Sequence, residues 1–436
     1  MKQKRYDVIG IGIGPFNLGL AALLDPVDEI DALFFDKDPY FEWHPGMLIQ
    51  GTDLQVPFIA DLVTFADPTS PYTFLNYAHT HNRLYSFFFF NRFDIPRQEY
   101  NEYAKWVSKQ LTSCQFGKRV VDVKDHQGDD AYYEVSVMNV KTEEMATFYA
   151  KHLVLGTGSV PLVPEKLEEA LNEDLLHTSS YLNRKEDVKR GNVITVVGSG
   201  QSAAEVFHDL LKEQDRCGYQ LNWLTRSPHF QQLEESKIAQ EVFSPDYVNY
   251  FHSLSFDERM NTLESLRPLR NGVEKATLQQ IYDLLYHRSV TTTDLSVTIQ
   301  ASTEVKSVQS VKDGTYSVSC YQHQTDQTFE METNKLILAT GYKPYVPKWL
   351  DNMRDEIVWE DEKRFKVTRD YRIAFKKERN NHLFTLTNLE HSHGAGATNL
   401  GLSVQRNQHI INKITGKGVY PIPQNTTFQQ FTPNTK

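Results

Sequence analysis

An apolar run passes into a glycine turn in Asp7-Val8-Ile9-Gly10-Ile11-Gly12-Ile13-Gly14-Pro15-Phe16-Asn17-Leu18. In a βαβ nucleotide-binding unit such a turn lets the backbone approach a pyrophosphate, which sits on the N-terminus of the following helix. Gly12 and Gly14 take the first two glycine positions, and Asn17 replaces the usual third glycine. Asp36 ends the next apolar run, where a carboxylate can accept hydrogen bonds from ribose hydroxyls. The pattern predicts a dinucleotide site; the alternative is a turn that only packs a helix on a strand.

A second copy of the pattern occupies residues 192–205, Asn-Val-Ile-Thr-Val-Val-Gly-Ser-Gly-Gln-Ser-Ala-Ala-Glu, with Ala203 in the third glycine position. Its second strand, residues 221–224, is followed by Thr225-Arg226 rather than by a carboxylate. An arginine at this place can pair with a 2′-phosphate, which an acid would repel; a solvated loop charge is the alternative. We therefore expect FAD at the first unit and NADPH at the second. The expected NADPH contacts are Gly198, Gly200, Gln201, Ser202 and Arg226.

The remaining chain reads as one nucleotide-binding domain interrupted by another. Residues 133–139 and 316–321 alternate like antiparallel strands, and each is followed by a buried-strand run that ends in glycine. Both places are typical of a chain crossing between domains. The sequence therefore predicts an α/β fold with two Rossmann-like domains and small antiparallel β elements at the crossings. The expected boundaries are 1–165 for the first part of the FAD domain, 166–335 for an inserted NADPH domain with substrate-contacting segments, and 336–436 for the second part of the FAD domain, with a flexible tail from about Pro421.

Composition narrows the class of protein. The chain has 436 residues and a net charge of -10 at pH 7, which argues against nucleic acid as a partner. Its three cysteines form no Cys-x-x-Cys pair, so neither a dithiol flavoprotein reductase nor a cysteine zinc site is expected, and no metal is expected elsewhere. The apolar run after Lys2 and Lys4 is interrupted by Asp7 and by glycines, unlike a secretory signal or a membrane span. We expect a cytoplasmic protein.

Several motifs, spread over nearly the whole chain, together resemble those of one enzyme family. They are Gly12-Ile13-Gly14-Pro15-Phe16-Asn17-Leu18, Trp43-His44-Pro45-Gly46-Met47, Pro68-Thr69-Ser70-Pro71 with Phe74-Leu75-Asn76-Tyr77, Gly198-Ser199-Gly200-Gln201-Ser202, Ala339-Thr340-Gly341-Tyr342 and His393-Gly394. The chain resembles the flavin-dependent N-hydroxylating monooxygenases of siderophore biosynthesis, which are the lysine and ornithine N-hydroxylases and their diamine relatives. The Trp-His-Pro-Gly-Met run is far more specific than any glycine motif.

The resemblance implies a reaction that the cofactors carry. NADPH reduces FAD, the reduced flavin takes up O2, and a flavin hydroperoxide passes its distal oxygen to a neutral primary amine. The protein supplies positioning, polarity and water exclusion, so no catalytic residue is expected beyond the flavin. The FAD contacts that the glycine turn and the resemblance imply are Gly12, Gly14, Pro15, Phe16, Asn17, Asp36, Trp43, His44, Met47, Gln55, Gly394 and Leu402. Without the motif, Trp43 and Met47 would read as ordinary core residues.

Substrate choice is expected to depend on Ala60. The resemblance implies that the amino acid hydroxylases carry a lysine at this position, which pairs with the substrate carboxylate. Without that lysine an α-carboxylate would be desolvated with one charge partner missing, a loss on the order of 2–5 kcal/mol. The expected substrate is therefore an amine without that group, namely putrescine, cadaverine or a similar diamine, or histamine. The expected contacts are Gln55, Ala60, Gln240 and Asn271, and a surface amide is the alternative for the last two.

Other functional classes remain open at this stage. An L-lysine or L-ornithine N-hydroxylase would belong to the same family, and a related flavin monooxygenase acting on sulfur or carbon would share both glycine turns. A flavoprotein kept only as a binding partner is the non-catalytic alternative, for which Gly14 or Gly200 would be expected to have decayed.

Two further expectations concern surfaces. The run Phe87-Phe88-Phe89-Phe90 is expected to form a buried strand or helix start; the alternative is an apolar wall of a substrate channel. Four adjacent aromatic side chains cannot all face one cavity on a helix or on a strand. The family resemblance also implies a homo-oligomer, either a dimer or a tetramer.

Overall fold

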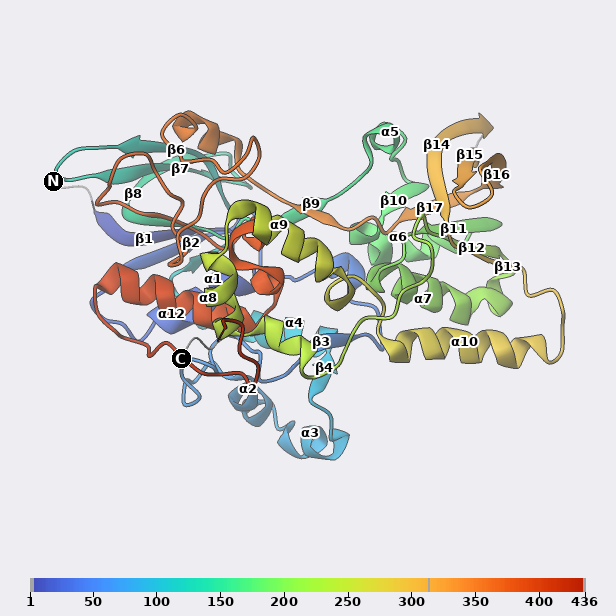
Figure 1. The fold of residues 1–436 in the computed structure, drawn as a ribbon, viewed down its shortest axis with the longest axis horizontal. Helices are drawn as coiled ribbons and strands as arrows, with labels where there is room; N and C mark the ends of the chain where they lie inside the picture. Colours follow the sequence, from blue (N-terminus) through green and yellow to red (C-terminus); the bar gives the residue numbers. More distant parts are fainter. Residues whose placement is uncertain (1–3, 313, 434–436) are drawn as a thin grey trace.

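A computed structural model, which describes residues 4–312 and 314–433, places the chain in two sheet-centred bodies (Figure 1). The first body is built on a seven-stranded sheet. Its strands, in spatial order, are β5 (Cys114–Gln115), β2 (Ala32–Phe35), β1 (Arg5–Ile11), β8 (Met145–Leu155), β7 (Tyr132–Asn139) and β6 (Lys118–His126), with β19 (Leu383–Thr385) paired to β8. The strands from β5 to β8 run parallel, and β19 is parallel to β8, whereas β8, β7 and β6 form an antiparallel meander.

Helices α1 (Pro15–Leu24) and α12 (Gly401–Thr415) lie below this sheet in Figure 1 and pack against each other. Almost every residue of α1 is buried, because the helix has the sheet on one side and α12 on another. Strand β2 and the second half of β1, from Val8 to Ile11, are buried apolar runs, as expected of parallel strands that are covered on both faces. The first glycine turn therefore lies between a buried strand and a buried helix.

The second body is built on a five-stranded parallel sheet. Its strands, in spatial order, are β10 (Leu175–His177), β17 (Lys335–Leu338), β11 (Val193–Val197), β12 (Gln220–Leu224) and β13 (Val297–Gln300). Helix α7 (Gln201–Cys217) buries Ala203, Phe207 and Leu210 against it, at the spacing of one helix face, and α10 (Lys275–Ser289) packs on α7. An antiparallel sheet of β14 (Thr303–Lys312), β15 (Thr315–Gln322) and β16 (Gln327–Thr333) is attached. The predicted α/β fold with two Rossmann-like domains is confirmed.

Two short strands connect the bodies (Figure 1). Strand β9 (Ser159–Pro161) leaves the first body after β8, β18 (Tyr342–Pro344) returns after β17, and the two pair antiparallel. Each follows one of the glycine-ended runs, and β7 and β15 are the antiparallel strands expected before them. The chain thus passes between the bodies at β9 and at β18.

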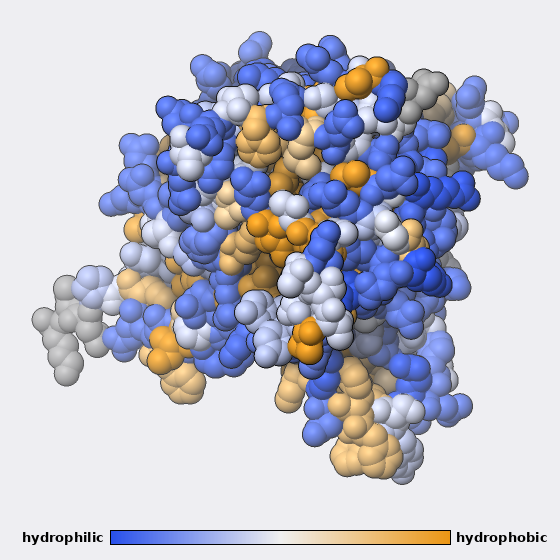
Figure 2. Space-filling view, turned by 90° about the vertical axis from the view of Figure 1, so that its right-hand side faces the viewer, coloured by the Kyte–Doolittle hydropathy of each residue, from blue (hydrophilic) through white to orange (hydrophobic). Residues whose placement is uncertain are grey.

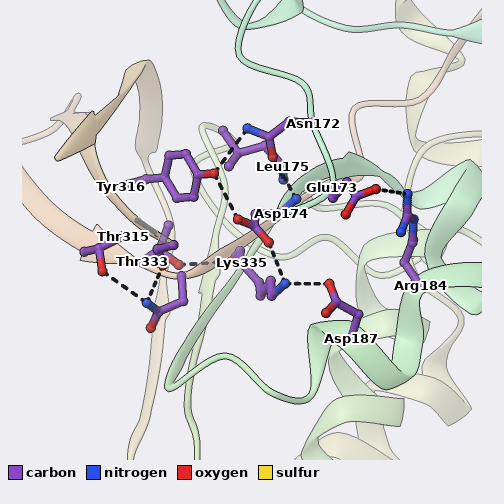
Figure 3. Close-up of polar contacts among 12 residues, drawn as sticks. Asn172, Glu173, Asp174, Leu175, Arg184, Asp187, Thr315, Tyr316, Thr333 and Lys335 are labelled. Atoms are coloured by element: carbon purple, nitrogen blue, oxygen red, sulfur yellow. Dashed lines mark hydrogen bonds and ion pairs between the residues drawn. The ribbon is translucent and has the colours of Figure 1, made fainter. Parts of the chain in front are cut away.

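An ion-pair network holds the outer edge of the second sheet, at the amino end of β17 (Figure 3). The Lys335 ammonium at the start of β17 lies 2.6 Å from Asp174 Oδ1 and 2.6 Å from Asp187 Oδ2, the latter on α6 (Tyr181–Val188). The Tyr316 hydroxyl donates to Asp174 Oδ2 over 3.0 Å. Lys335 holds the pKa of Asp187 below its ordinary value. The network joins β17, α6 and the β15 strand of the attached sheet.

Helices α8 (Pro245–Ser253) and α9 (Phe256–Ser265) fall within 166–335, the range expected for the second domain, yet they lie with the first body (Figure 1). His252 Nε2 is 3.0 Å from the Val367 carbonyl, and Arg259 forms a buried ion pair with Glu360. Both partners belong to the C-terminal part of the chain. The long excursion from β12 to β13 therefore returns to the first body before it completes the second sheet.

Residues 421–433, part of the segment expected to be flexible, make polar contacts with the rest of the protein. Gln408 of α12 donates to the Pro421 carbonyl over 2.8 Å, and further along the tail the backbone amides of Asn425 and Gln429 are bound by carboxylates near α8. Polar tails have little to bury, but this one finds acceptors for its amides on the protein surface. Residues 434–436 of the expected flexible segment lie outside the described residues.

The expected burial of the four phenylalanines is wrong. They end α3 (Leu84–Phe90), a short helix at the bottom of Figure 1 in which no residue is buried. Phe88 and Phe89 are 71% and 77% exposed, and Phe87 packs against the rings of Phe58 and Phe74. Successive helical residues point about 100° apart, so a one-sided surface helix cannot turn all four rings inward.

None of the helices in ranges 4–312 and 314–433 combines the length and the apolar character needed to cross a membrane. In the same ranges no group of three or more histidine, cysteine or acidic side chains is arranged to hold a metal ion.

Candidate dinucleotide and substrate sites

The first glycine turn leaves an open cradle at the start of α1. Gly12 has φ +86°, and a Cβ there would come within 2.4 Å of the Gly156 carbonyl oxygen. A Cβ on Gly14 would meet no atom within 4 Å, although Gly14 is the cap of a buried helix. No side chain caps this helix and its first turn carries no acid, so its free N–H groups and dipole favour an anion.

Asn17 supports this turn from inside the protein. It is fully buried, and its Nδ2 donates to the Gly12 carbonyl over 2.7 Å. The room for it comes from Gly156 at the end of β8, where a Cβ would stand 2.4 Å from Nδ2. Pro15 is buried in the first helical turn, and Phe16 is half-buried under the Arg406 guanidinium, 4.6 Å from its ring centre. Asn17 thus shapes the turn, and its side chain does not reach the surface of the cradle.

Asp36 lies beside the turn, at the end of β2. Its Oδ2 accepts from the Ile13 amide over 2.6 Å and its Oδ1 from the Asp38 amide over 2.8 Å. Burial raises the pKa of Asp36, and the two amide bonds oppose that change. Each carboxylate oxygen has a second lone pair, so Asp36 is oriented and can still accept hydrogen bonds from ribose hydroxyls.

The second glycine turn repeats the cradle at the start of α7. A Cβ on Gly198, with φ +145°, would come within 2.4 Å of the Ala339 carbonyl oxygen, whereas one on Gly200 would meet nothing within 4 Å. This helix N-terminus also lacks a side-chain cap and an acid in its first turn. Ser202 is half-buried in that first turn. Here too, the backbone is open to an anion.

Arg226 follows β12 at the mouth of this second cradle. It is exposed, and the next residue, Ser227, touches the turn through Oγ, 3.0 Å from Ser199 Oγ. Gln201, by contrast, is already engaged by the protein: its Oε1 accepts from the Glu274 amide and its Nε2 donates to Thr277 and Glu205. Arg226 is therefore available to a ligand, while Gln201 fixes the turn to α10.

The Trp-His-Pro-Gly-Met run forms the contact between the two bodies. It folds into η1 (Pro45–Met47), which packs on η2 (Thr178–Ser180) of the second body. A Cβ on Gly46 would stand 1.9 Å from the Ser179 carbonyl oxygen, so only glycine permits this approach. Met47 is buried in the hydrophobic core of the second body, and Trp43 packs edge-on against Tyr100.

His44 is an exposed residue of this run. Desolvation and the Arg97 charge lower the pKa of His44 to about 4, so the imidazole is neutral at physiological pH. Its ring lies 5.7 Å from that of Tyr342, the first residue of the returning β18. His44 therefore lines the junction between the bodies, between the two cradles.

An ion pair that the sequence did not indicate closes the same junction. Arg97, at the start of α4 (Arg97–Ser108), binds both carboxylate oxygens of Glu205 on α7, at 2.7 and 2.9 Å, and also donates to the Met47 carbonyl. The two side chains are only 13% and 3% exposed. Burial and the charge of Glu205 raise the pKa of the neighbouring Glu274 to about 7. No local motif links these residues, because Arg97 and Glu205 are 108 positions apart.

Two of the expected substrate positions, Ala60 and the turn that carries Gln240, lie against the segment that contains Gly394 and Leu402. Ala60 is buried, and its methyl lies 3.6 Å from where a Cβ on Gly401 would stand. The 3-10 turn η3 (Ala239–Phe243), which carries the half-buried Gln240, packs against η6 (Ala395–Thr398). Asn271 is exposed, and its neighbour Arg270 pairs with Glu390 just before Gly394. Gln55 is exposed on β3 (Asp53–Pro57).

Asp61 fixes the loop that carries Ala60. Its carboxylate accepts four hydrogen bonds of 2.6–3.0 Å, from the amides of Val63, Thr64 and Phe74 and from the Thr64 hydroxyl. Burial raises the pKa of Asp61 despite these bonds. The one acid next to Ala60 in the chain is thus fully used inside the protein, and Ala60 itself contributes only a methyl group.

Comparisons with known proteins agree with this geometry. A family model described as L-lysine 6-monooxygenase/L-ornithine 5-monooxygenase matches residues 4–344. Putrescine N-hydroxylases from Shewanella oneidensis and Acinetobacter baumannii are each 39% identical; the matches cover 98% and 100% of this chain and 84% and 95% of theirs. The L-lysine N6-monooxygenase of Escherichia coli is 31% identical, with 96% and 97% covered.

A solved structure has the same fold over its whole length. It is the FAD-bound cadaverine monooxygenase of the desferrioxamine pathway from Erwinia amylovora, 37% identical, with a TM-score of 0.94 and 100% of both chains covered. The family model covers most of this chain and the relatives cover nearly all of it. The chain belongs to the L-lysine 6-monooxygenase/L-ornithine 5-monooxygenase family.

Proposed function

We propose that the protein hydroxylates the nitrogen of a primary amine without an α-carboxylate, a diamine such as putrescine or cadaverine, with FAD, NADPH and O2. The observation that carries this proposal is the buried methyl of Ala60 beside Gly401, because a methyl offers a carboxylate no charge partner at this position. The names of the more similar relatives, putrescine N-hydroxylase and cadaverine monooxygenase, support the same substrate class over lysine.

The residues present fit two dinucleotides. The open space at Gly14 and Gly200 admits a pyrophosphate against each backbone, and the uncapped N-termini of α1 and α7 supply N–H donors. Asp36 suits the ribose of FAD, and Arg226 suits the 2′-phosphate of NADPH. When bound, reduced FAD would activate O2, which would give one oxygen atom to the amine and the other to water, with NADPH as the source of the electrons.

The protein's own part is to hold the amine, free of its proton, next to that chemistry. An ammonium has no lone pair, and desolvation lowers its pKa toward neutrality. Gln55, Gln240 and Asn271 offer amide oxygens that accept from the amine N–H groups and orient the lone pair. The chain's net charge of -10 attracts a dicationic substrate from solution.

The setting of the reaction follows from its reagents. NADPH is supplied in the cytoplasm, which supports a cytoplasmic enzyme. The N-hydroxyamine product is the kind of intermediate that siderophore biosynthesis consumes, as the desferrioxamine pathway of the Erwinia amylovora relative indicates.

We also propose that the protein is a homo-oligomer that uses α3. Tyr85, Phe88, Phe89 and Phe93 are exposed. Figure 2 shows pale orange side chains at the lowest part of the molecule, the height at which Figure 1 places α3. The flanking Arg83 and Arg92 are already paired with Glu99 and Asp53, so two copies can bury this face without opposing free charges. Light scattering should give a multimer, and Phe88→Ser with Phe89→Ser should give smaller particles.

The function is tested by comparing NADPH oxidation with hydroxylamine formation for putrescine, cadaverine, histamine, L-lysine and L-ornithine. Diamines should give the best coupled turnover; best turnover with an amino acid would contradict the Ala60 argument. Ala60→Lys should lower diamine turnover because its ammonium would oppose the far ammonium of the substrate, a penalty on the order of 2 kcal/mol. Ala60→Val, which adds volume without charge, is the matched control.

A further inference from the structure

The C-terminal tail is anchored at its base to the first body. After α12 the chain turns back, and the Tyr420 amide donates to Asn412 Oδ1 over 3.0 Å. The Tyr420 hydroxyl donates to the Leu23 carbonyl at the end of α1 over 2.7 Å. The tail that follows α12 is therefore fixed at Tyr420.

Beyond this base, the tail is bound by two carboxylates at the η3–α8 junction. Glu241 accepts from the backbone amides of Phe428 and Gln429 over 2.9 and 2.8 Å. Asp246, in the first turn of α8, accepts from the Asn425 amide over 3.2 Å and from the Thr426 amide and hydroxyl. These bonds satisfy the amides of an extended segment that has no strand partner.

An aromatic side chain completes the attachment. The Phe431 ring lies 4.9 Å from that of Tyr247, edge to face, and 6.1 Å from that of Tyr250. It thereby joins the small hydrophobic cluster of Val242, Tyr247 and Phe251. Phe428, three residues earlier, is 99% exposed and makes no such contact. Only one of the two tail phenylalanines holds the tail in place.

The tail meets the chain on both sides of Gln240. The Gln429 side-chain amide donates to the Ile238 carbonyl, two residues before Gln240, and its backbone amide donates to Glu241, one residue after. The far side of the same turn rests on η6, where a Cβ on Gly396 would stand 3.6 Å from Phe243. The turn that carries Gln240 is therefore clamped between η6 and the tail.

We infer that residues 425–431 form a strap that holds the Gln240 turn in its substrate-contacting position, so that the tail sets the affinity for the amine. The inference rests on the proposed function, because Gln240 is a substrate contact only there. The strap touches neither glycine turn in the contacts described above, so it acts on amine binding and not on flavin reduction by NADPH. Gln429, Phe431 and Glu241 are positioning residues that act through Gln240.

The test compares Phe431→Ala with Phe428→Ala, which removes the same ring from an exposed place in the same segment. Phe431→Ala should raise the KM for putrescine about tenfold, because the ring contacts are lost, and leave FAD content and the KM for NADPH unchanged. Hydrogen exchange of the amides in 238–251 should become faster. Phe428→Ala should leave all four quantities unchanged. Gln429→Ala, a milder change that does not threaten folding, should raise the putrescine KM about twofold to threefold.

Two results would overturn the strap. Unchanged exchange in Phe431→Ala would mean that the tail does not hold the turn. Faster exchange with an unchanged putrescine KM would mean that the held turn does not set amine affinity. If the unmodified protein hydroxylates none of the amines, the proposed function fails by itself, and the exchange comparison still decides whether residues 425–431 hold the turn.

Discussion

The two glycine turns have the same backbone shape but different neighbours. A Cβ on Gly12 would stand 2.4 Å from the Gly156 carbonyl oxygen, and a Cβ on Gly198 would stand 2.4 Å from the Ala339 carbonyl oxygen. Gly156 and Ala339 therefore occupy equivalent places in the two bodies. In the first body Gly156 has no side chain, and the larger Asn17 fills the space. In the second body both equivalent places hold alanine. A dinucleotide-binding turn can therefore carry a larger residue in place of its third glycine when the neighbouring strand ends in a glycine.

The two turns also differ in what stands beside them. Asp36 is held by two backbone amides, so the first site has a fixed acceptor. Arg226 is exposed beside the second, where no carboxylate ends the strand. A fixed acceptor discriminates hydroxyl groups, and a guanidinium discriminates phosphate. We propose that these similar backbones select different dinucleotides through one residue each.

The largest effect is expected from adding a methyl to each open glycine. Gly14→Ala should weaken FAD binding about 100-fold, since the methyl occupies the pyrophosphate's approach, a loss comparable to about two charge-assisted hydrogen bonds. Gly200→Ala should keep its flavin and lose affinity for NADPH to a similar degree. Flavin absorbance and NADPH titration measure the two. A Gly200→Ala protein that is purified without flavin would break the assignment of the two sites.

A smaller effect is expected from Arg226→Ala. Loss of the guanidinium should raise the KM for NADPH about 10- to 30-fold, roughly 1.5–2 kcal/mol, the contribution of a charge-assisted hydrogen bond. The KM for NADH, which has no 2′-phosphate, should not change. Steady-state kinetics with both nucleotides on the same preparation provide the internal control. An equal rise for both nucleotides would show that Arg226 does not read the phosphate.

The exchange of space between Asn17 and Gly156 can be tested by a mutant cycle. Gly156→Ala places a Cβ 2.4 Å from the Asn17 side chain and should lower the free energy of unfolding by about 1.5 kcal/mol. Asn17→Ala removes the obstacle, so the double variant should lose less than the sum of the single changes. Urea titrations measure all three. Strict additivity would mean that the two residues do not share this space.

The smallest effect concerns Glu274, which lies only beside the second turn. Its pKa is raised to about 7, so between about pH 4.5 and pH 7 the folded protein binds more protons there than the unfolded chain. The free energy of unfolding should therefore fall across this range, by about 1 kcal/mol after allowance for the partly open site. Glu274→Gln should remove that fall in urea titrations at pH 5 and pH 8. Glu332→Gln, at an exposed strand position, should retain it.

Local signals carried most of the fold into the sequence prediction. The glycine turns, the apolar strands on either side and the crossings at residues 159 and 342 each depend on a short stretch of chain, so spacing and composition were sufficient. The acid after β2 and the arginine after β12 stand where the motif predicts them. Their side-chain directions follow from the strand ends.

Contacts between distant segments could not be predicted in the same way. Arg97 meets Glu205 over 108 positions, and the Thr426 amide meets Asp246 over 180. From the sequence alone, Arg97, Glu205 and Asp246 would each be taken for an ordinary surface charge. The polar composition of the tail favoured mobility because it has little to bury, and it gave no sign that two carboxylates would bind its amides. For α3 the sequence prediction failed in the opposite way: its aromatic residues favoured burial, but the helix is exposed.

The glycine of the Trp-His-Pro-Gly-Met run determines the distance between the two bodies. Because Gly46 lies against the Ser179 backbone, the inserted body approaches the first as closely as two main chains allow. A Cβ at this position would stand 1.9 Å from the Ser179 carbonyl oxygen, so any other residue would push the two dinucleotide-binding bodies apart. A misplacement of 1 Å can cost about 100-fold in rate. The absence of a side chain at Gly46 thus sets how closely the two dinucleotide-binding bodies approach each other.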